Sequence, residues 1–113
     1  MAFAPATALA DLPDAAPVRV EVDGVPVCLV RTGDAVRAVH DVCSHQRWSL
    51  ADGEIVDGAV ECSLHGSTFD LDTGRPRTLP AVTPVPTYAV RVTDGRVEVD
   101  VAGPTNGAAV PAH

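Results

Sequence analysis

Residues 88–101 are YAVRVTDGRVEVDV, and this stretch indicates the fold class. Apolar side chains at positions 88, 90 and 92, and again at 97, 99 and 101, alternate with their neighbours, the period-two pattern of a half-buried β-strand. Asp94-Gly95 separates the two halves, and Asp-Gly is a favoured pair for a two-residue hairpin turn. The stretch therefore predicts an antiparallel hairpin.

The N-terminal part repeats this pattern. Valines at 18, 20 and 22 alternate with charged residues, Asp23-Gly24 follows, and residues 25–30 predict the return strand. Residues 35–40 predict a third strand. Between 41 and 84 the periodicity weakens, and only residues 54–56 and 59–61, around Asp57-Gly58, predict a short hairpin. We expect an all-β protein in which both ends of the chain build an antiparallel framework around a loop-rich insert.

Length, charge and cysteine content exclude several classes. A chain of 113 residues allows one domain. With 15 acidic against 8 basic residues, its net charge of −7 argues against nucleic acid and anionic membrane surfaces as partners. No apolar run has the length of a membrane span, and the first residues lack the pattern of a signal peptide. Three cysteines cannot all pair within one chain, which favours a reducing compartment, and we expect a cytoplasmic protein.

The insert holds four candidate metal ligands. Cys43-Ser44-His45 is followed by sixteen residues and then by Cys62-Ser63-Leu64-His65, so that each half supplies one thiolate and one imidazole. Such a set can hold a zinc ion or an iron–sulfur cluster. Zinc sites of this composition usually place like residues close together, whereas here they are split between distant halves. The spacing favours a two-iron cluster, with both thiolates on one iron and both imidazoles on the other. A structural zinc module and unrelated core residues stay as alternatives.

The pattern C-x-H-x16-C-x2-H, continued by His65-Gly66-Ser67-Thr68-Phe69, Thr73-Gly74 and Leu79-Pro80-Ala81, resembles the Rieske [2Fe–2S] proteins. The resemblance implies a Rieske fold, an antiparallel β-sandwich or barrel-like base with a loop-rich cluster-binding subdomain at about residues 42–80. It covers roughly residues 2–101, and we expect a single Rieske domain at 1–101. The small, polar and Pro-containing residues 102–113 predict a flexible tail. The implied cofactor is one [2Fe–2S] cluster with Cys43, His45, Cys62 and His65 as ligands.

At two positions the sequence differs from the high-potential Rieske proteins, and these differences indicate which branch of the family it resembles. Those members carry two further cysteines, at the positions of Trp48 and Leu64 here, so no disulfide can join the two ligand loops. The run Trp48-Ser49-Leu50 is similar to the soluble bacterial ferredoxins of ring-hydroxylating dioxygenases. This resemblance implies a monomeric one-electron carrier that passes electrons from a flavin-dependent ferredoxin reductase to a terminal non-heme iron oxygenase.

Two other electron-transfer roles stay open. Leu64-His65-Gly66-Ser67, with Pro84-Val85-Pro86, is also similar to small Rieske proteins that are accessories in iron–sulfur cluster assembly, and the small subunit of a nitrite reductase is a further alternative. The sequence shows no acid–base pair, nucleophile motif or phosphate loop, and a cluster with four protein ligands has no open position for substrate. We therefore expect a component of a multicomponent system, not an enzyme. Cys28 is expected to be a small buried hydrophobic residue, and His40 a structural or surface residue.

Overall fold

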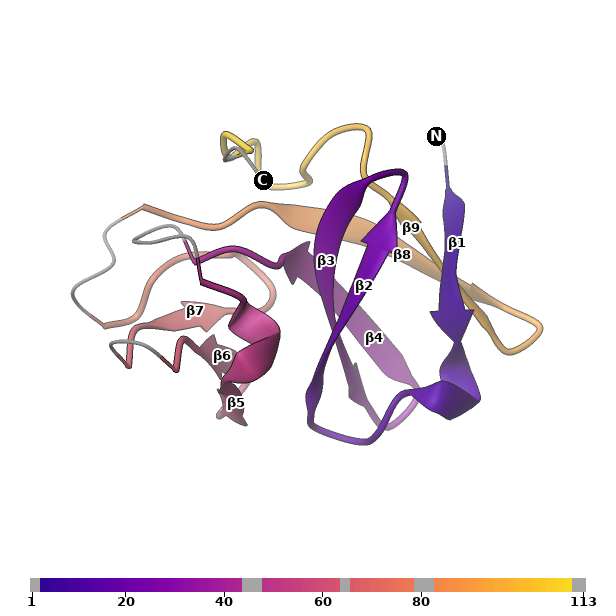
Figure 1. The fold of residues 1–113 in the computed structure, drawn as a ribbon, viewed down its shortest axis with the longest axis horizontal. Coiled ribbons are helices and arrows are strands. Elements are labelled where there is room, and N and C mark those ends of the chain that lie inside the picture. The colour runs from indigo at the N-terminus through magenta and orange to yellow at the C-terminus, as the bar shows by residue number, and fades with distance from the viewer. Residues whose placement is uncertain (1–2, 44–47, 64–65, 79–82, 111–113) are drawn as a thin grey trace.

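The computed structural model describes residues 3–43, 48–63, 66–78 and 83–110, and these form two antiparallel sheets (Figure 1). The six-stranded sheet has the order β1-β9-β8-β4-β3-β2, and the three-stranded sheet the order β5-β6-β7. The strands are β1 (Ala4–Ala8), β2 (Pro17–Val22), β3 (Val25–Thr32), β4 (Ala35–His40), β5 (Glu54–Val56), β6 (Ala59–Glu61), β7 (Thr68–Asp70), β8 (Thr87–Thr93) and β9 (Arg96–Asp100). Two short 3₁₀ turns are η1 (Leu9–Asp11) and η2 (Leu50–Asp52).

The three Asp-Gly pairs form the hairpin turns that the sequence predicts. Asp23, Asp57 and Asp94 all have positive φ, between 47° and 51°, and each is followed by a glycine with φ between 73° and 79°. Two consecutive residues with positive φ define a type I′ turn, whose twist matches that of the paired strands. These turns join β2 to β3, β5 to β6 and β8 to β9.

The six-stranded sheet curls into a nearly closed barrel, since its two edge strands β1 and β2 contact each other. A core of leucines, valines and Tyr88 fills its interior. Strand β1, which the sequence pattern did not predict, pairs with β9 and contains an irregularity between Pro5 and Thr7. Proline is tolerated there because an edge strand leaves part of its backbone without a ladder partner.

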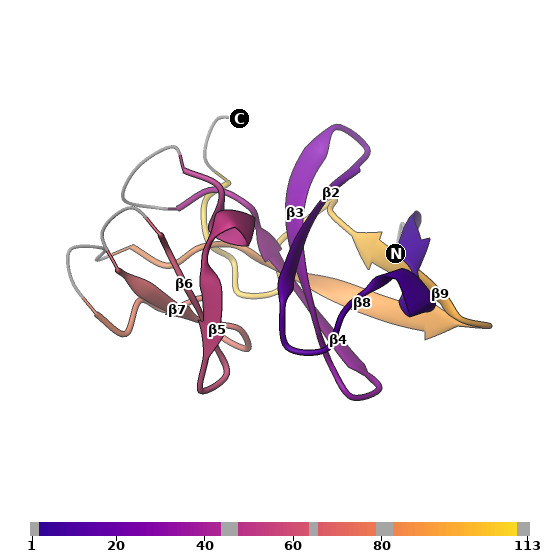
Figure 2. The same cartoon turned by 60° about the horizontal axis from the view of Figure 1, so that its bottom comes forward.

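Strand β3 is buried on both faces, and this links the barrel to the small sheet. Val27 and Leu29 point into the barrel core, whereas Cys28 and Val30 belong to a second core that contains residues of the small sheet. In both views, β3 and β4 lie between β5–β7 and the side of the barrel formed by β1 and β9 (Figures 1 and 2). Consecutive strand residues face opposite sides, so a run of five buried residues in β3 requires a packed layer on each side.

The predicted fold class is confirmed: the protein is all-β, with an antiparallel barrel-like base and a separate, loop-rich unit carrying the small sheet. Strand β7 was not predicted, because its three residues show no period and no Asp-Gly turn marks them, as Asp57-Gly58 marks the equally short β5–β6 hairpin. Among the described residues, no helix has the length and apolar character needed to cross a membrane.

A buried polar pair ties β4 to β8 inside the fold. The side chains of His40 and Tyr88 are both buried, and Nδ1 of His40 lies 2.9 Å from the Tyr88 hydroxyl oxygen. Burial disfavours the phenolate and raises the pKa of Tyr88 to about 12. His40, at the end of its strand, is therefore a structural residue.

This raised pKa predicts a loss of stability in alkali. In the unfolded chain the tyrosine titrates near pH 10. The contribution of neutral Tyr88 to the free energy of unfolding is therefore complete below about pH 10 and is lost as the pH rises towards about 12. Tyr88 is the only tyrosine, so near-ultraviolet absorbance titrates it alone. We expect a titration midpoint near 12 in the folded protein and a shallower loss of unfolding free energy in Tyr88→Phe. A midpoint near the unfolded value would contradict the buried placement.

Candidate metal centre

Two of the four predicted ligands lie in one buried core. Cys43 follows β4 and Cys62 follows β6, and their exposed fractions are 2% and 1%. Neither cysteine is in a disulfide, and both belong to the core that also contains Phe69 and Val85. The fold thus brings together two cysteines that are nineteen positions apart, in surroundings shielded from water. The other two predicted ligands, His45 and His65, lie outside the described residues.

The two cysteines begin loops that are closed in the same way. The backbone N–H of Cys43 donates to the carbonyl oxygen of Trp48 at 2.9 Å, and that of Cys62 donates to the carbonyl oxygen of Ser67 at 2.7 Å. In each case the acceptor is five residues further along the chain. Gly66, with a φ of 74°, also donates to the carbonyl of Cys62. The positions of His45 and His65 fall within these two closed loops.

This donor set fits the cluster that the sequence motif predicts. Buried cysteines that are presented from two loops and form no disulfide are suitable ligands for an iron–sulfur cluster. The described residues show no group of three or more His, Cys, Asp or Glu side chains that could hold a metal.

A side-chain hydrogen bond connects the two loops. The indole N–H of Trp48, at the end of the first loop, donates to the hydroxyl oxygen of Ser63 in the second, at 2.7 Å. Trp48 is 41% exposed, so its ring lies partly at the surface. This bond therefore joins the loops that follow Cys43 and Cys62.

A buried carboxylate anchors the first loop to the barrel. Asp41 is fully buried, and its Oδ2 accepts hydrogen bonds from Arg19 of β2 at 2.8 Å and from the Ser49 hydroxyl at 2.5 Å. Its Oδ1 accepts from the backbone N–H of Ala51 at 2.8 Å. One side chain, two residues before Cys43, thus connects β2 with the end of the loop and the start of η2. The sequence analysis missed it, although a lone acidic residue after an apolar strand was a usable signal.

Cys28 is a third thiol in the same core, but its environment differs. It lies within β3, opposite Arg19 and Val39, and is fully buried. Burial, with a contribution from the nearby charge of Asp41, raises the pKa of the Cys28 thiol far above its usual range. It therefore stays protonated and packs as a small apolar residue, as the sequence predicts.

Comparison with known proteins identifies the family to which the chain belongs. Residues 2–89 match the model of the Rieske [2Fe-2S] domain, which is most of the chain. The chain belongs to this family, and the cofactor of the family is one [2Fe–2S] cluster. The match ends before β9 and the C-terminal segment.

Relatives of known sequence or structure to which the chain is similar include ferredoxins of dioxygenase systems. The chain is 45% identical over 76 residues to the anthranilate 1,2-dioxygenase ferredoxin subunit of Burkholderia cepacia, covering 67% of this chain and 70% of that one. It is similar to the structure of the ferredoxin of carbazole 1,9a-dioxygenase from Nocardioides aromaticivorans IC177, with a TM-score of 0.84, 36% identity and coverage of 88% and 97%. A complex of reduced oxygenase and oxidized ferredoxin in carbazole 1,9a-dioxygenase also matches, with a TM-score of 0.81, 28% identity and coverage of 96% and 97%.

Replacement of Asp41 by alanine should strongly destabilise the protein. It removes three hydrogen bonds to a buried carboxylate, at a cost of about 1–3 kcal/mol for each donor left without an acceptor. Arg19 adds little to this cost, because its side chain is 46% exposed and stays in contact with water. The matched control is Asp72→Ala, because Asp72 also pairs with an arginine, at 2.9 Å, but is 69% exposed. Its loss should cost less than about 1 kcal/mol. Urea unfolding measures both, and equal losses would refute the anchoring role of Asp41.

The Trp48–Ser63 bond predicts a non-additive pair of substitutions. Trp48→Phe and Ser63→Ala each remove the bond, and each should speed release of iron to a chelator about fivefold, as expected for a net contribution of about 1 kcal/mol. The double variant should release iron no faster than the single ones, because the shared interaction is lost only once. If the two effects multiply instead, the residues act independently and the bond does not hold the loops together.

Proposed function

We propose that this protein is a one-electron carrier whose [2Fe–2S] cluster is held by Cys43, His45, Cys62 and His65. The observation that carries the proposal is a pair of cysteines that are buried in one core and form no disulfide. Each begins a loop that is closed by a backbone hydrogen bond to the residue five positions further along the chain. The family match supports it. Each of the two loops also contains one of the histidines of the motif.

The residues of the chain account for the properties that a carrier needs. When bound, the cluster supplies reversible one-electron chemistry in which two imidazoles in place of thiolates raise the reduction potential. Cys43 and Cys62 would hold it from the buried side, and Val85, Phe69 and Leu50 keep water from that side. All four protein ligands are used, so no coordination position is left for substrate. This supports a carrier rather than a catalyst.

The proposed electron acceptor is the terminal oxygenase of a ring-hydroxylating dioxygenase system, and the proposed donor is a flavin-dependent ferredoxin reductase. The relatives are named as ferredoxin components of such systems, and one matching structure is a complex of an oxygenase with its ferredoxin. These names favour the dioxygenase role over cluster assembly or nitrite reduction. We further propose that the protein is cytoplasmic, in keeping with three cysteines that form no disulfide, and that it is a monomer.

Reconstitution tests both parts of this proposal. The wild type, reconstituted anaerobically, should bind two iron and two sulfide per chain, as one [2Fe–2S] cluster requires. After chemical reduction it should be reoxidised by an oxidised Rieske oxygenase of the anthranilate or biphenyl type, with visible absorbance following the transfer. Alanine at any of the four ligand positions should abolish the normal cluster spectrum.

The matched control is Cys28→Ala, which removes a buried thiol from the same core and should leave the spectrum intact. If Cys28→Ala loses the cluster while a motif variant keeps it, the ligand assignment is wrong. If the wild type binds the cluster but reduces no oxygenase, the ligand assignment stands and the dioxygenase role does not.

A further inference from the structure

The C-terminal segment makes specific contacts with the site-bearing unit. After β9 the chain turns back across the start of β8 (Figure 1). There the backbone N–H of Thr105 donates to the carbonyl oxygen of Thr87 at 2.7 Å, and the two threonine hydroxyl oxygens lie 2.5 Å apart. Residues 102–113 were expected to be a flexible tail from their composition alone. The contacts of residues 102–108 point instead to an ordered segment.

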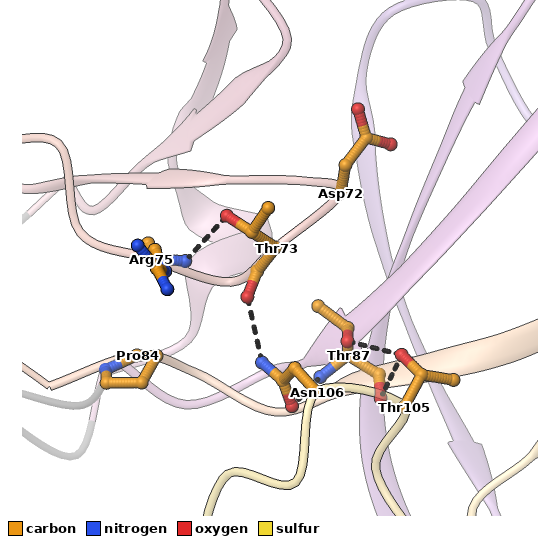
Figure 3. Close-up of a pocket in the computed structure, with 7 residues that line it drawn as sticks. All are labelled: Asp72, Thr73, Arg75, Pro84, Thr87, Thr105 and Asn106. Atoms are coloured by element: carbon orange, nitrogen blue, oxygen red, sulfur yellow. Dashed lines mark hydrogen bonds between the residues drawn. The ribbon is translucent and has the colours of Figure 1, made fainter.

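Asn106 uses its whole side-chain amide in these contacts. Its Nδ2 donates to the carbonyl oxygens of Thr73 at 2.9 Å and Val85 at 2.8 Å. Its Oδ1 accepts from the backbone N–H groups of Thr87 at 3.3 Å and Ala108 at 3.2 Å. Figure 3 shows Asn106 reaching from the C-terminal segment towards Thr73, beside an open pocket of about 470 Å³. Two donors and one acceptor group are all that an asparagine side chain offers, and each is satisfied.

Thr73 and Gly74 lie beside Val85, and we call the place where these two segments meet the neck. The backbone N–H of Val85 donates to the carbonyl oxygen of Gly74 at 2.8 Å, which closes the chain between residues 74 and 85. The packing at the neck is tight, since a Cβ at Gly74 would lie 2.1 Å from the Val85 carbonyl oxygen and 2.7 Å from Nδ2 of Asn106. Asn106 therefore bonds to both sides of the neck.

The neck is coupled to the candidate metal centre through Val85. Its carbonyl accepts the bond from Asn106, and its fully buried side chain packs in the core that contains Cys43 and Cys62. A shift of the neck would therefore change the packing around both thiols, because close-packed cores transmit small displacements.

We propose that residues 102–107 form a strap and that Asn106 is a positioning residue for the metal centre, holding Thr73 and Val85 together at the neck. The part that concerns the cluster rests on the proposed function. The strap itself does not, because its contacts are all within the protein.

The first test uses hydrogen exchange of the wild-type protein. The backbone N–H groups of Thr105 and Ala108 should be protected, because Thr105 donates to Thr87 and Ala108 donates to Asn106 of the strap. The N–H groups of a flexible tail exchange at the rate of an unstructured peptide. If these N–H groups exchange at the rate of an unstructured peptide, the proposal that residues 102–107 form a strap is wrong. The experiment needs no variant, and it is decisive even if the chain binds no cluster.

The second test compares Asn106→Ala with Thr105→Ala, which keeps both bonds across the neck. Asn106→Ala should speed exchange at Val85, and bleaching of the oxidised cluster by an iron chelator, by about thirtyfold, as expected for the loss of two hydrogen bonds. Exchange at Leu29 in β3 should not change. The reduction potential should shift in Asn106→Ala and stay at the wild-type value in Thr105→Ala.

Equal acceleration at Val85 and Leu29 would show general destabilisation and would refute a local positioning role. Wild-type bleaching and potential in Asn106→Ala would refute it as well. If the wild type itself binds no cluster, the proposed function fails, and exchange at Val85 still tests whether Asn106 holds the neck.

Discussion

Strands β3 and β4 form a wall between the two cores, and the rest of the structure depends on the burial of both its faces. Residues 26–30 of β3 are all buried, and alternate side chains serve two different cores. The barrel closes over one face of the wall, and the unit with the candidate ligands packs on the other. Each fully buried valine or leucine contributes about 1.5–3 kcal/mol relative to exposure, so the small sheet, with strands of only three residues, is stabilised by packing rather than by its own ladder.

Polar contacts determine how the loops sit on this wall. Asp41 fixes the loop after Cys43 to β2, the Trp48–Ser63 bond joins that loop to the loop after Cys62, and Asn106 bonds to Thr73 and Val85. None of these contacts involves a metal. The loops are therefore held by the protein's own interactions, which is consistent with a centre that exchanges electrons with little rearrangement of its surroundings.

The sequence could predict those features that depend on local pattern. The Asp-Gly turns, strand β4 and the β5–β6 hairpin have the predicted bounds, because a period of two and a turn signal are local properties. The burial of Cys43 and Cys62 together follows from the motif. Strand β1 (Ala4–Ala8) and residues 102–107 could not be predicted in this way, because neither shows a period. The contacts of β1 are with β9, and those of residues 102–107 are with Thr73, Val85 and Thr87, all distant in the sequence.

The central claim is that two thiolates from one core and two imidazoles from its closing loops hold a single [2Fe–2S] cluster. Pulsed EPR of the chemically reduced protein, labelled with ¹⁵N-histidine, tests it most directly. The account predicts two iron-bound histidine nitrogens per cluster, with unchanged couplings in His40→Gln, because His40 bonds to Tyr88 within the fold. A reduced cluster that shows no coupling to histidine nitrogen would contradict the account.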